Sequence, residues 1–311
     1  MDRNDVDWKG YWVATPTPFT RDGAVDEAAW RAGLRHYLKM GVHGVLVNGT
    51  TGEWFSQSDA ERRRVAEIAV EELKGKIPVV IGCTTYTARQ TIEFALHARD
   101  IGADGVLSTP PPYAAPTPRE IVAFFRSISD AVDLPLMVYN WARGTQVEIT
   151  WETAAELARI DRVVALKDST TNRLQAIRTL EEVGDRLRVF GGFANRLGYA
   201  LLRTMGGDGS IDGGAVAGQY AVSFYEAHWR GGTKAALSHA ETYAAIMGQL
   251  INPDWSGRFG SPQSQIKAAM NMLGQPGGWP RPPLLPVDDA AALDALRGIL
   301  AAGGLFQKSA A

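Results

Sequence analysis

One stretch of the chain decides the fold: residues 163–170, which read Val-Val-Ala-Leu-Lys-Asp-Ser-Thr. Four consecutive apolar residues predict a strand that is buried on both faces, as in a parallel sheet. Lys167 follows them at the carboxyl end of this strand. In an α/β barrel that end of the strands faces the active site, whereas the other end serves stability.

Lys167 is a candidate nucleophile because it leaves a buried strand. Desolvation disfavours the ammonium form of a lysine, and the neutral amine is the form that attacks a carbonyl to make a Schiff base. A lysine in this position can also extend its charged end to the surface, or pair with the adjacent Asp168. The strand by itself leaves these alternatives open.

Outward from this strand, apolar runs alternate with segments of helical periodicity. Strands are expected at 11–14, 45–47, 79–81, 105–107, 136–139, 163–166, 187–190 and 209–211, each followed by a helix. Short strand–helix units of this kind predict a parallel sheet, and eight of them match a closed (β/α)8 TIM barrel. A doubly wound sheet is the alternative, but no glycine-rich dinucleotide fingerprint follows the first strand.

The alternation ends near residue 231, so we predict a barrel over 1–231 and a C-terminal extension over 232–311. The extension contains three expected helices, at 234–250, 261–273 and 288–302. It is expected to pack on the barrel as a helical appendage.

Charge and composition exclude several classes of protein. The net charge of −2 offers no basic field for nucleic acid or an anionic membrane. Cys83 is the single cysteine, so neither an internal disulfide nor a multi-cysteine metal site is possible. We see no secretory signal and no apolar run that could span a bilayer. We therefore expect a cytoplasmic protein that binds neither a metal nor a cofactor.

Three polar clusters are predicted to meet at the mouth of the barrel. They are Gly49-Thr50-Thr51-Gly52-Glu53 after the second strand, Tyr139-Asn140 after the fifth, and Lys167-Asp168-Ser169 at the end of the sixth. The first is a turn whose N–H groups and hydroxyls could hold a carboxylate, with Glu53 organising the loop. Tyr139 could relay protons beside the lysine. An ordinary loop and a core aromatic are the structural alternatives.

Together with Gly206-Gly207-Asp208-Gly209-Ser210-Ile211, these motifs resemble those of the dihydrodipicolinate synthase and N-acetylneuraminate lyase superfamily. The resemblance covers nearly the whole chain. It implies that Lys167 forms an imine with pyruvate or another 2-oxo acid, and that Thr50 and Thr51 bind its carboxylate. It further implies a proton relay through Tyr139.

The resemblance also implies an assembly and the lining of a pocket. Members are commonly homotetramers, built as dimers of dimers, in which a second tyrosine enters from a neighbouring subunit; Tyr113 matches it. Ile211 is expected to line the pocket through its backbone, with Gly49 and Ser169 as further predicted substrate contacts.

Two positions depart from the family pattern. The synthases carry an arginine shortly after Tyr-Asn, where this chain has Gly144, with Arg143 one residue early and Trp141 nearby. Gly144 is expected to leave space that Trp141 borders. The lyases for sialic acid place acidic residues after the seventh strand, where 191–195 reads Gly-Gly-Phe-Ala-Asn.

These observations predict a class I lyase that makes or breaks a carbon–carbon bond next to a pyruvate-derived imine, acting on a 4-hydroxy-2-oxo acid. A dehydratase of a 2-oxo-3-deoxy sugar acid and 4-hydroxy-tetrahydrodipicolinate synthase are alternatives. A catalytically silent barrel that binds 2-oxo acids is an alternative of another class.

Overall fold

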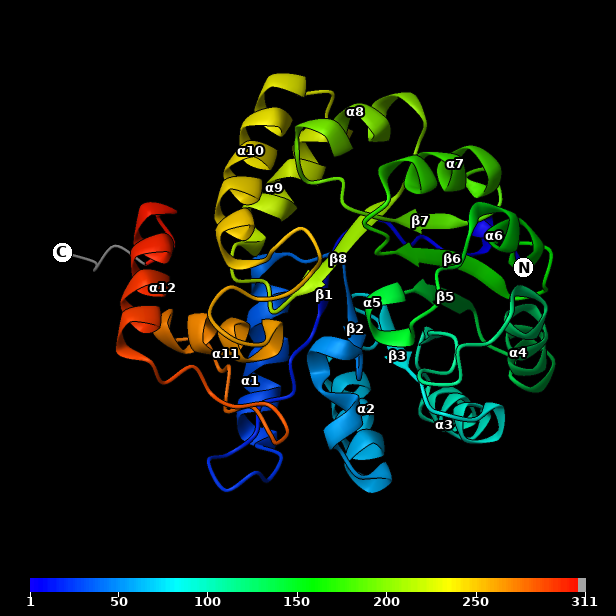
Figure 1. Cartoon of the computed structure of the whole chain (residues 1–311), viewed down its shortest axis with the longest axis horizontal. Helices are drawn as coiled ribbons and strands as arrows, with labels where there is room; N and C mark the ends of the chain where they lie inside the picture. The colour runs from blue at the N-terminus through cyan, green and yellow to red at the C-terminus, as the bar shows by residue number, and fades with distance from the viewer. Residues whose placement is uncertain (307–311) are drawn as a thin grey trace.

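The computed structural model describes residues 1–306 and contains a closed barrel of eight parallel strands in sequence order (Figure 1). Residues 307–311, at the end of the predicted extension, lie outside the described residues. The strands are β1 (Gly10–Ala14), β2 (Gly44–Val47), β3 (Val79–Gly82), β4 (Gly105–Ser108), β5 (Leu136–Asn140), β6 (Val163–Asp168), β7 (Arg188–Phe190) and β8 (Gly209–Gly213). The predicted TIM barrel is confirmed. β8 is two residues longer than expected, which brings Asp212 into the sheet.

A helix follows each strand and covers the outside of the barrel (Figure 1). These helices are α1 (Glu27–Met40), α2 (Asp59–Leu73), α3 (Ala88–Ile101), α4 (Pro118–Ala131), α6 (Trp151–Leu157), α7 (Arg173–Val183), α8 (Arg196–Thr204) and α9 (Gly218–Trp229). A one-turn helix after β5, α5 (Ala142–Thr145), was not expected from the sequence. Ser58 caps α2 in a capping box with Glu61, as the sequence predicts.

Large aromatic side chains fill the barrel interior below the strand ends. The ring of Trp12 contacts those of Trp8 and Phe190 edge to face, at centroid distances of 5.6 and 5.2 Å. A Cβ atom on Gly44 of the neighbouring strand would lie 2.4 Å from the indole of Trp12, so this position needs a glycine. Packing of this kind closes the floor of the barrel and leaves the opposite end for a site.

Three helices, α10 (Thr233–Leu250), α11 (Pro262–Met272) and α12 (Ala290–Ala302), lie on the side of the barrel formed by α8, α9 and α1 (Figure 1). A buried ion pair joins this extension to the loop after β2. Lys267 of α11 donates to Glu53, and both side chains are at most 1% exposed. The second carboxylate oxygen of Glu53 accepts from the backbone N–H of Arg281 at 2.9 Å. Glu53 therefore organises its loop, as expected from the sequence.

Replacing Lys267 by methionine should destabilise the whole chain, because Glu53 would stay buried without its cation. Loss of one partner of a buried pair costs about 3–5 kcal/mol. Urea unfolding of Lys267→Met should show a loss of this size in the free energy of unfolding. Lys234→Met, at an exposed position of α10, is the matched control and should change that free energy little. A loss below about 1 kcal/mol in Lys267→Met would contradict the assigned role of the pair.

Candidate active site

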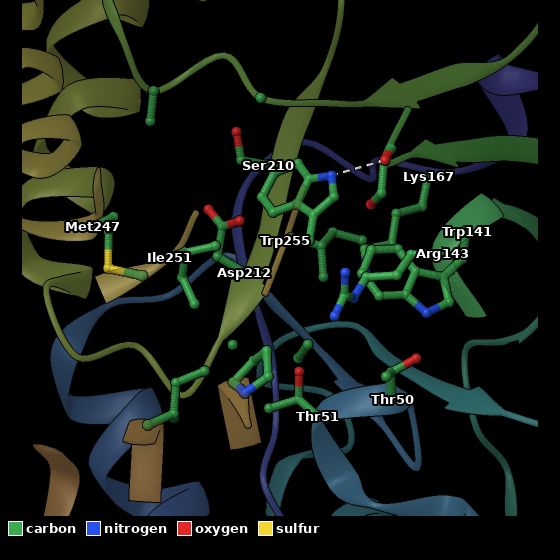
Figure 2. A pocket seen from close by; sticks show the side chains of 18 of the residues that line it. Thr50, Thr51, Trp141, Arg143, Lys167, Ser210, Asp212, Met247, Ile251 and Trp255 are labelled. Atoms are coloured by element: carbon green, nitrogen blue, oxygen red, sulfur yellow. Dashed lines mark hydrogen bonds between the residues drawn. The ribbon is translucent and has the colours of Figure 1, made fainter. Parts of the chain in front are cut away.

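A cavity of about 510 Å³ opens at the carboxyl ends of the strands (Figure 2). It brings together most of the residues that the sequence singled out. Among its lining residues are Thr50, Thr51, Tyr139, Trp141, Arg143, Gly144, Lys167, Ser169 and Ile211. Two predicted residues, Gly49 and Tyr113, do not line it.

Lys167 is buried at the end of β6, with 8% of its surface exposed. It lies directly opposite Tyr139 of β5 in the parallel ladder, and its Nζ is 3.8 Å from the centroid of that ring. Within residues 1–306 no carboxylate forms a salt bridge with Lys167. The structure therefore shows neither a lysine that extends to the surface nor an ion pair between Lys167 and Asp168.

Asp168 is engaged by other groups. Its Oδ1 accepts hydrogen bonds from Nδ2 of Asn140 at 2.9 Å and from the backbone N–H of Thr170 at 3.1 Å. Burial raises the pKa of Asp168 to about 6, against the opposing effect of these donors. Asn140 also accepts from the N–H of Ile149 at 3.0 Å. The Asn140–Asp168 contact thus ties β5 to β6 beside the lysine and engages the carboxylate that could otherwise pair with it.

The loop after β2 presents two hydroxyls to the cavity from a single 3-10 turn, Thr50–Gly52. The carbonyl of Thr50 accepts from Nε2 of Gln263 of α11 at 3.1 Å, so the C-terminal extension holds the turn in place. The side chain of Thr51 packs beside Gly213 of β8, where a Cβ atom would lie 3.1 Å from its hydroxyl. Neither hydroxyl forms a hydrogen bond with the described residues, so both can accept or donate to a ligand.

Trp141 occupies the space expected beside Gly144. A Cβ atom at position 144 would lie 2.5 Å from the indole, which stacks on the ring of Tyr139 at a centroid distance of 5.7 Å and an interplanar angle of 22°. Glycine at 144 therefore makes room for a tryptophan wall and does not leave an open space. Arg143 pairs with Asp254 across the rim, Nη1 to Oδ2 at 3.0 Å.

Tyr113 lies outside the cavity of its own chain. Its side chain is 93% exposed, and its backbone has a φ of +72°, which is uncommon for a residue with a side chain. An exposed aromatic on a constrained backbone is compatible with insertion into another subunit. That role stays a prediction.

Sequence reasoning missed an acid in the cavity, Asp212 of β8. Its Oδ2 accepts from the hydroxyl of Tyr243 at 2.7 Å, and burial raises its pKa, opposed by the Tyr243 hydrogen bond and the charge of Lys167. An acidic residue directly after the Ile211 motif was a visible signal, but its partner is 31 positions away on α10.

Trp255 was also missed as a residue of the site, because the sequence identifies it only as a tryptophan in a loop. Its Nε1 donates to the carbonyl of Ser169 at 2.9 Å, and its indole lines the cavity beside Lys167 (Figure 2).

The model of the Dihydrodipicolinate synthetase family matches residues 7–302. The chain belongs to this family. An uncharacterized DapA-like lyase of Rhizobium meliloti is 35% identical over 286 residues, 92% of this chain and 93% of that protein. The 4-hydroxy-tetrahydrodipicolinate synthase of Parvibaculum lavamentivorans is 35% identical over 95% of this chain and 99% of its own. The resemblance seen in the sequence is confirmed, and with it the expectation of a lyase.

The structural comparison agrees. The dihydrodipicolinate synthase of Acinetobacter baumannii, solved in complex with pyruvate, superimposes with a TM-score of 0.86 at 26% identity, over 96% of this chain and 99% of that one.

No helix within residues 1–306 is long and apolar enough to cross a membrane. In the same range, no group of three or more histidine, cysteine or acidic side chains is placed to hold a metal ion.

An alanine at position 144 should displace the indole of Trp141 from Tyr139. Such overpacking costs about 1–3 kcal/mol in the free energy of unfolding. The tryptophan emission spectrum should shift as well. Gly192→Ala is the matched control, since Gly192 also lines the cavity but a Cβ there has no atom within 4 Å. Equal stabilities and equal spectra for the two variants would show that the indole does not depend on Gly144.

Proposed function

We propose that Lys167 is the nucleophile of a class I, pyruvate-dependent aldolase that acts on 4-hydroxy-2-oxo acids. The observation that carries the proposal is the buried lysine, which has no carboxylate partner among the described residues and lies against Tyr139 at the mouth of the barrel. An amine in this place meets the requirements of Schiff-base catalysis, because it is shielded from water and positioned by rigid strands.

The reaction follows from this placement. The lone pair of Nζ attacks C2 of pyruvate, and loss of one water with uptake of one proton leaves a protonated imine. C3 then loses a proton, and the electron pair of that C–H bond moves toward the imine nitrogen to give an enamine. C3 attacks the carbonyl carbon of an aldehyde, whose oxygen takes up one proton and becomes the 4-hydroxyl. Water then hydrolyses the protonated imine, releasing the 4-hydroxy-2-oxo acid, the free lysine and the proton taken up in the first step. Cleavage is the reverse sequence.

Thr50, Thr51 and Tyr139 have distinct proposed roles. The two threonine hydroxyls face the cavity opposite the lysine and suit the carboxylate of the 2-oxo acid (Figure 2). Tyr139 relays protons to and from the reacting oxygens. Its hydroxyl forms no hydrogen bond with the described residues, which leaves it available to the substrate. Ser169 and Ile211 line the same part of the cavity.

The synthase activity of the curated relatives is the second candidate, because several of them carry that name at about the same identity. Two features of this chain favour the aldolase. Gly144 has no side chain to bind the carboxylate of aspartate semialdehyde, and Arg143 forms an ion pair with Asp254 at the exposed rim. Arginine recognises carboxylates through paired N–H donors, so a synthase site without a free arginine would bind that substrate poorly.

We further propose a cytoplasmic homotetramer in which Tyr113 completes the active site of a neighbouring subunit. Its near-complete exposure within one chain supports this assignment, since large aromatic side chains are enriched at interfaces.

Reduction with borohydride in the presence of pyruvate should add one pyruvate-derived adduct per chain, mapped by mass spectrometry to Lys167. Lys267→Met is unsuitable as a control because it removes a structural pair, so Lys234→Met serves instead and should still be labelled. An adduct on another lysine, or normal labelling of Lys167→Ala, would refute the mechanism. No adduct at all would favour a barrel that only binds 2-oxo acids.

Tyr139→Phe removes a single hydroxyl and should keep the aromatic contact with Lys167. We expect kcat to fall by roughly 10²–10⁴, the usual contribution of general acid–base catalysis. Tyr199→Phe, a buried tyrosine outside the cavity, should leave kcat unchanged. Near-native turnover of Tyr139→Phe would reduce the residue to a packing role.

A further inference from the structure

The cavity extends beyond the residues that the proposed chemistry uses, along one face of α10. Tyr243, Ala244, Met247 and Gly248 line it at helical spacing, followed by Ile251, and Asp212 of β8 lies at their base. We call these six residues the α10 lobe. Figure 2 shows Met247, Ile251 and Asp212 on the side of the cavity away from Trp141 and Lys167.

Asp212 gives the lobe a polar base. Its neighbour Ile211 packs inside the barrel, and because side chains alternate along a strand, Asp212 points toward the helices. Tyr243 donates to Oδ2, and burial keeps the pKa of this phenol well above its ordinary value, so its hydroxyl stays protonated. Within the described residues no hydrogen bond reaches Oδ1. Asp212 is only partly buried and lines the cavity, so Oδ1 can accept a hydrogen bond from a hydroxyl of a bound ligand.

The charges around the lobe select against a carboxylate. Arg143, the nearest arginine that lines the cavity, is paired with Asp254. Lys167 is joined to the 2-oxo acid during the reaction, and the carboxylate of that substrate offsets the charge of the protonated imine. A second carboxylate placed near Asp212 would meet like charge.

The helix leaves room in the lobe because small residues occupy its exposed turn. A Cβ atom on Gly248 has no atom within 4 Å, and Ala244 precedes it by one turn. Met247 and Ile251 flank this opening with apolar surface. The lobe can therefore hold a chain of several carbons. The hydroxyl donors of that chain would face Asp212, and its C–H groups would face Met247 and Ile251.

We propose that the α10 lobe binds the distal end of the aldehyde, and that this end is an uncharged, hydroxylated carbon chain that donates a hydrogen bond to Asp212. The proposal rests on the aldolase function and adds the class of the second substrate. The new bond joins C3 of pyruvate to the aldehyde carbon, as described above, so the lobe holds the carbons beyond C4 of the product. Trp141 forms the wall on the opposite side.

The first test compares aldehydes of equal length in condensation with pyruvate. D-erythrose, butanal and succinic semialdehyde each contain four carbons, and carry hydroxyls, no polar group, or a carboxylate at the distal end. We expect kcat/KM to be highest for D-erythrose and lowest for succinic semialdehyde. A preference for succinic semialdehyde would overturn the proposal.

The second test fills the lobe. Gly248→Leu should lower kcat/KM for D-erythrose at least about 10-fold more than for two-carbon glycolaldehyde, as expected when a pocket excludes part of a substrate. Ala245→Leu is the matched control, because Ala245 is exposed on the same helix and does not line the cavity. Equal effects of Gly248→Leu on the long and short aldehydes would also refute the proposal.

The third test removes the charge of Asp212 with little change in shape. Asp212→Asn should reduce the preference for D-erythrose over butanal by at least about 10-fold, since a hydrogen bond to a charged group is stronger than one to a neutral group. An unchanged preference in a folded variant would exclude Asp212 as the acceptor.

Borohydride trapping with pyruvate on the unmodified protein tests the aldolase function separately from the role of the α10 lobe. Without an adduct the aldolase function fails, whereas an adduct with no dependence on Gly248 or Asp212 refutes the lobe alone.

Discussion

The buried pair of Glu53 and Lys267 is the interaction on which the rest of the site depends. It joins the loop after β2 to α11 across more than 200 positions of sequence, with both charges removed from water. Desolvation lowers the pKa of Lys267 to about 8, partly offset by the attraction of Glu53. Such a pair is stable only when each partner is fully satisfied, so it fixes the position of both segments. The threonine turn and Gln263, which holds it, follow from that position.

Closure of the barrel supplies the second constraint. Parallel strands in sequence order bring their carboxyl ends to one rim, and the register of β5 against β6 places Tyr139 beside Lys167 and Asn140 beside Asp168. The Tyr139–Lys167 pair and the Asn140–Asp168 pair keep the amine and the neighbouring carboxylate apart. The inner pair surrounds the amine with an aromatic face, while the outer pair engages the carboxylate that would otherwise neutralise it.

Most charged side chains in and around the cavity are paired with an opposite charge. Arg143 is paired at the rim and Lys267 is paired beneath the threonine turn, while Asp212 keeps one oxygen toward the cavity. Trp141 stacks on Tyr139, and Trp255 donates a hydrogen bond to the carbonyl of Ser169. This distribution of charge is the basis of the proposal that a 2-oxo acid binds at the lysine and a neutral, hydroxylated chain binds beyond it.

The sequence by itself determined the barrel, and it singled out most of the residues that the structure brings together in one cavity. Both follow from local signals: the apolar run before Lys167, the period of strand and helix, and the polar clusters at strand ends. What the tertiary structure decided are pairings between distant residues. Arg143 meets Asp254 over 111 positions and Asp212 meets Tyr243 over 31, and neither contact has a local pattern that would reveal it. The space beside Gly144 belongs to this group too, because a glycine in the sequence says that a side chain is missing, while only packing shows that Trp141 fills the gap.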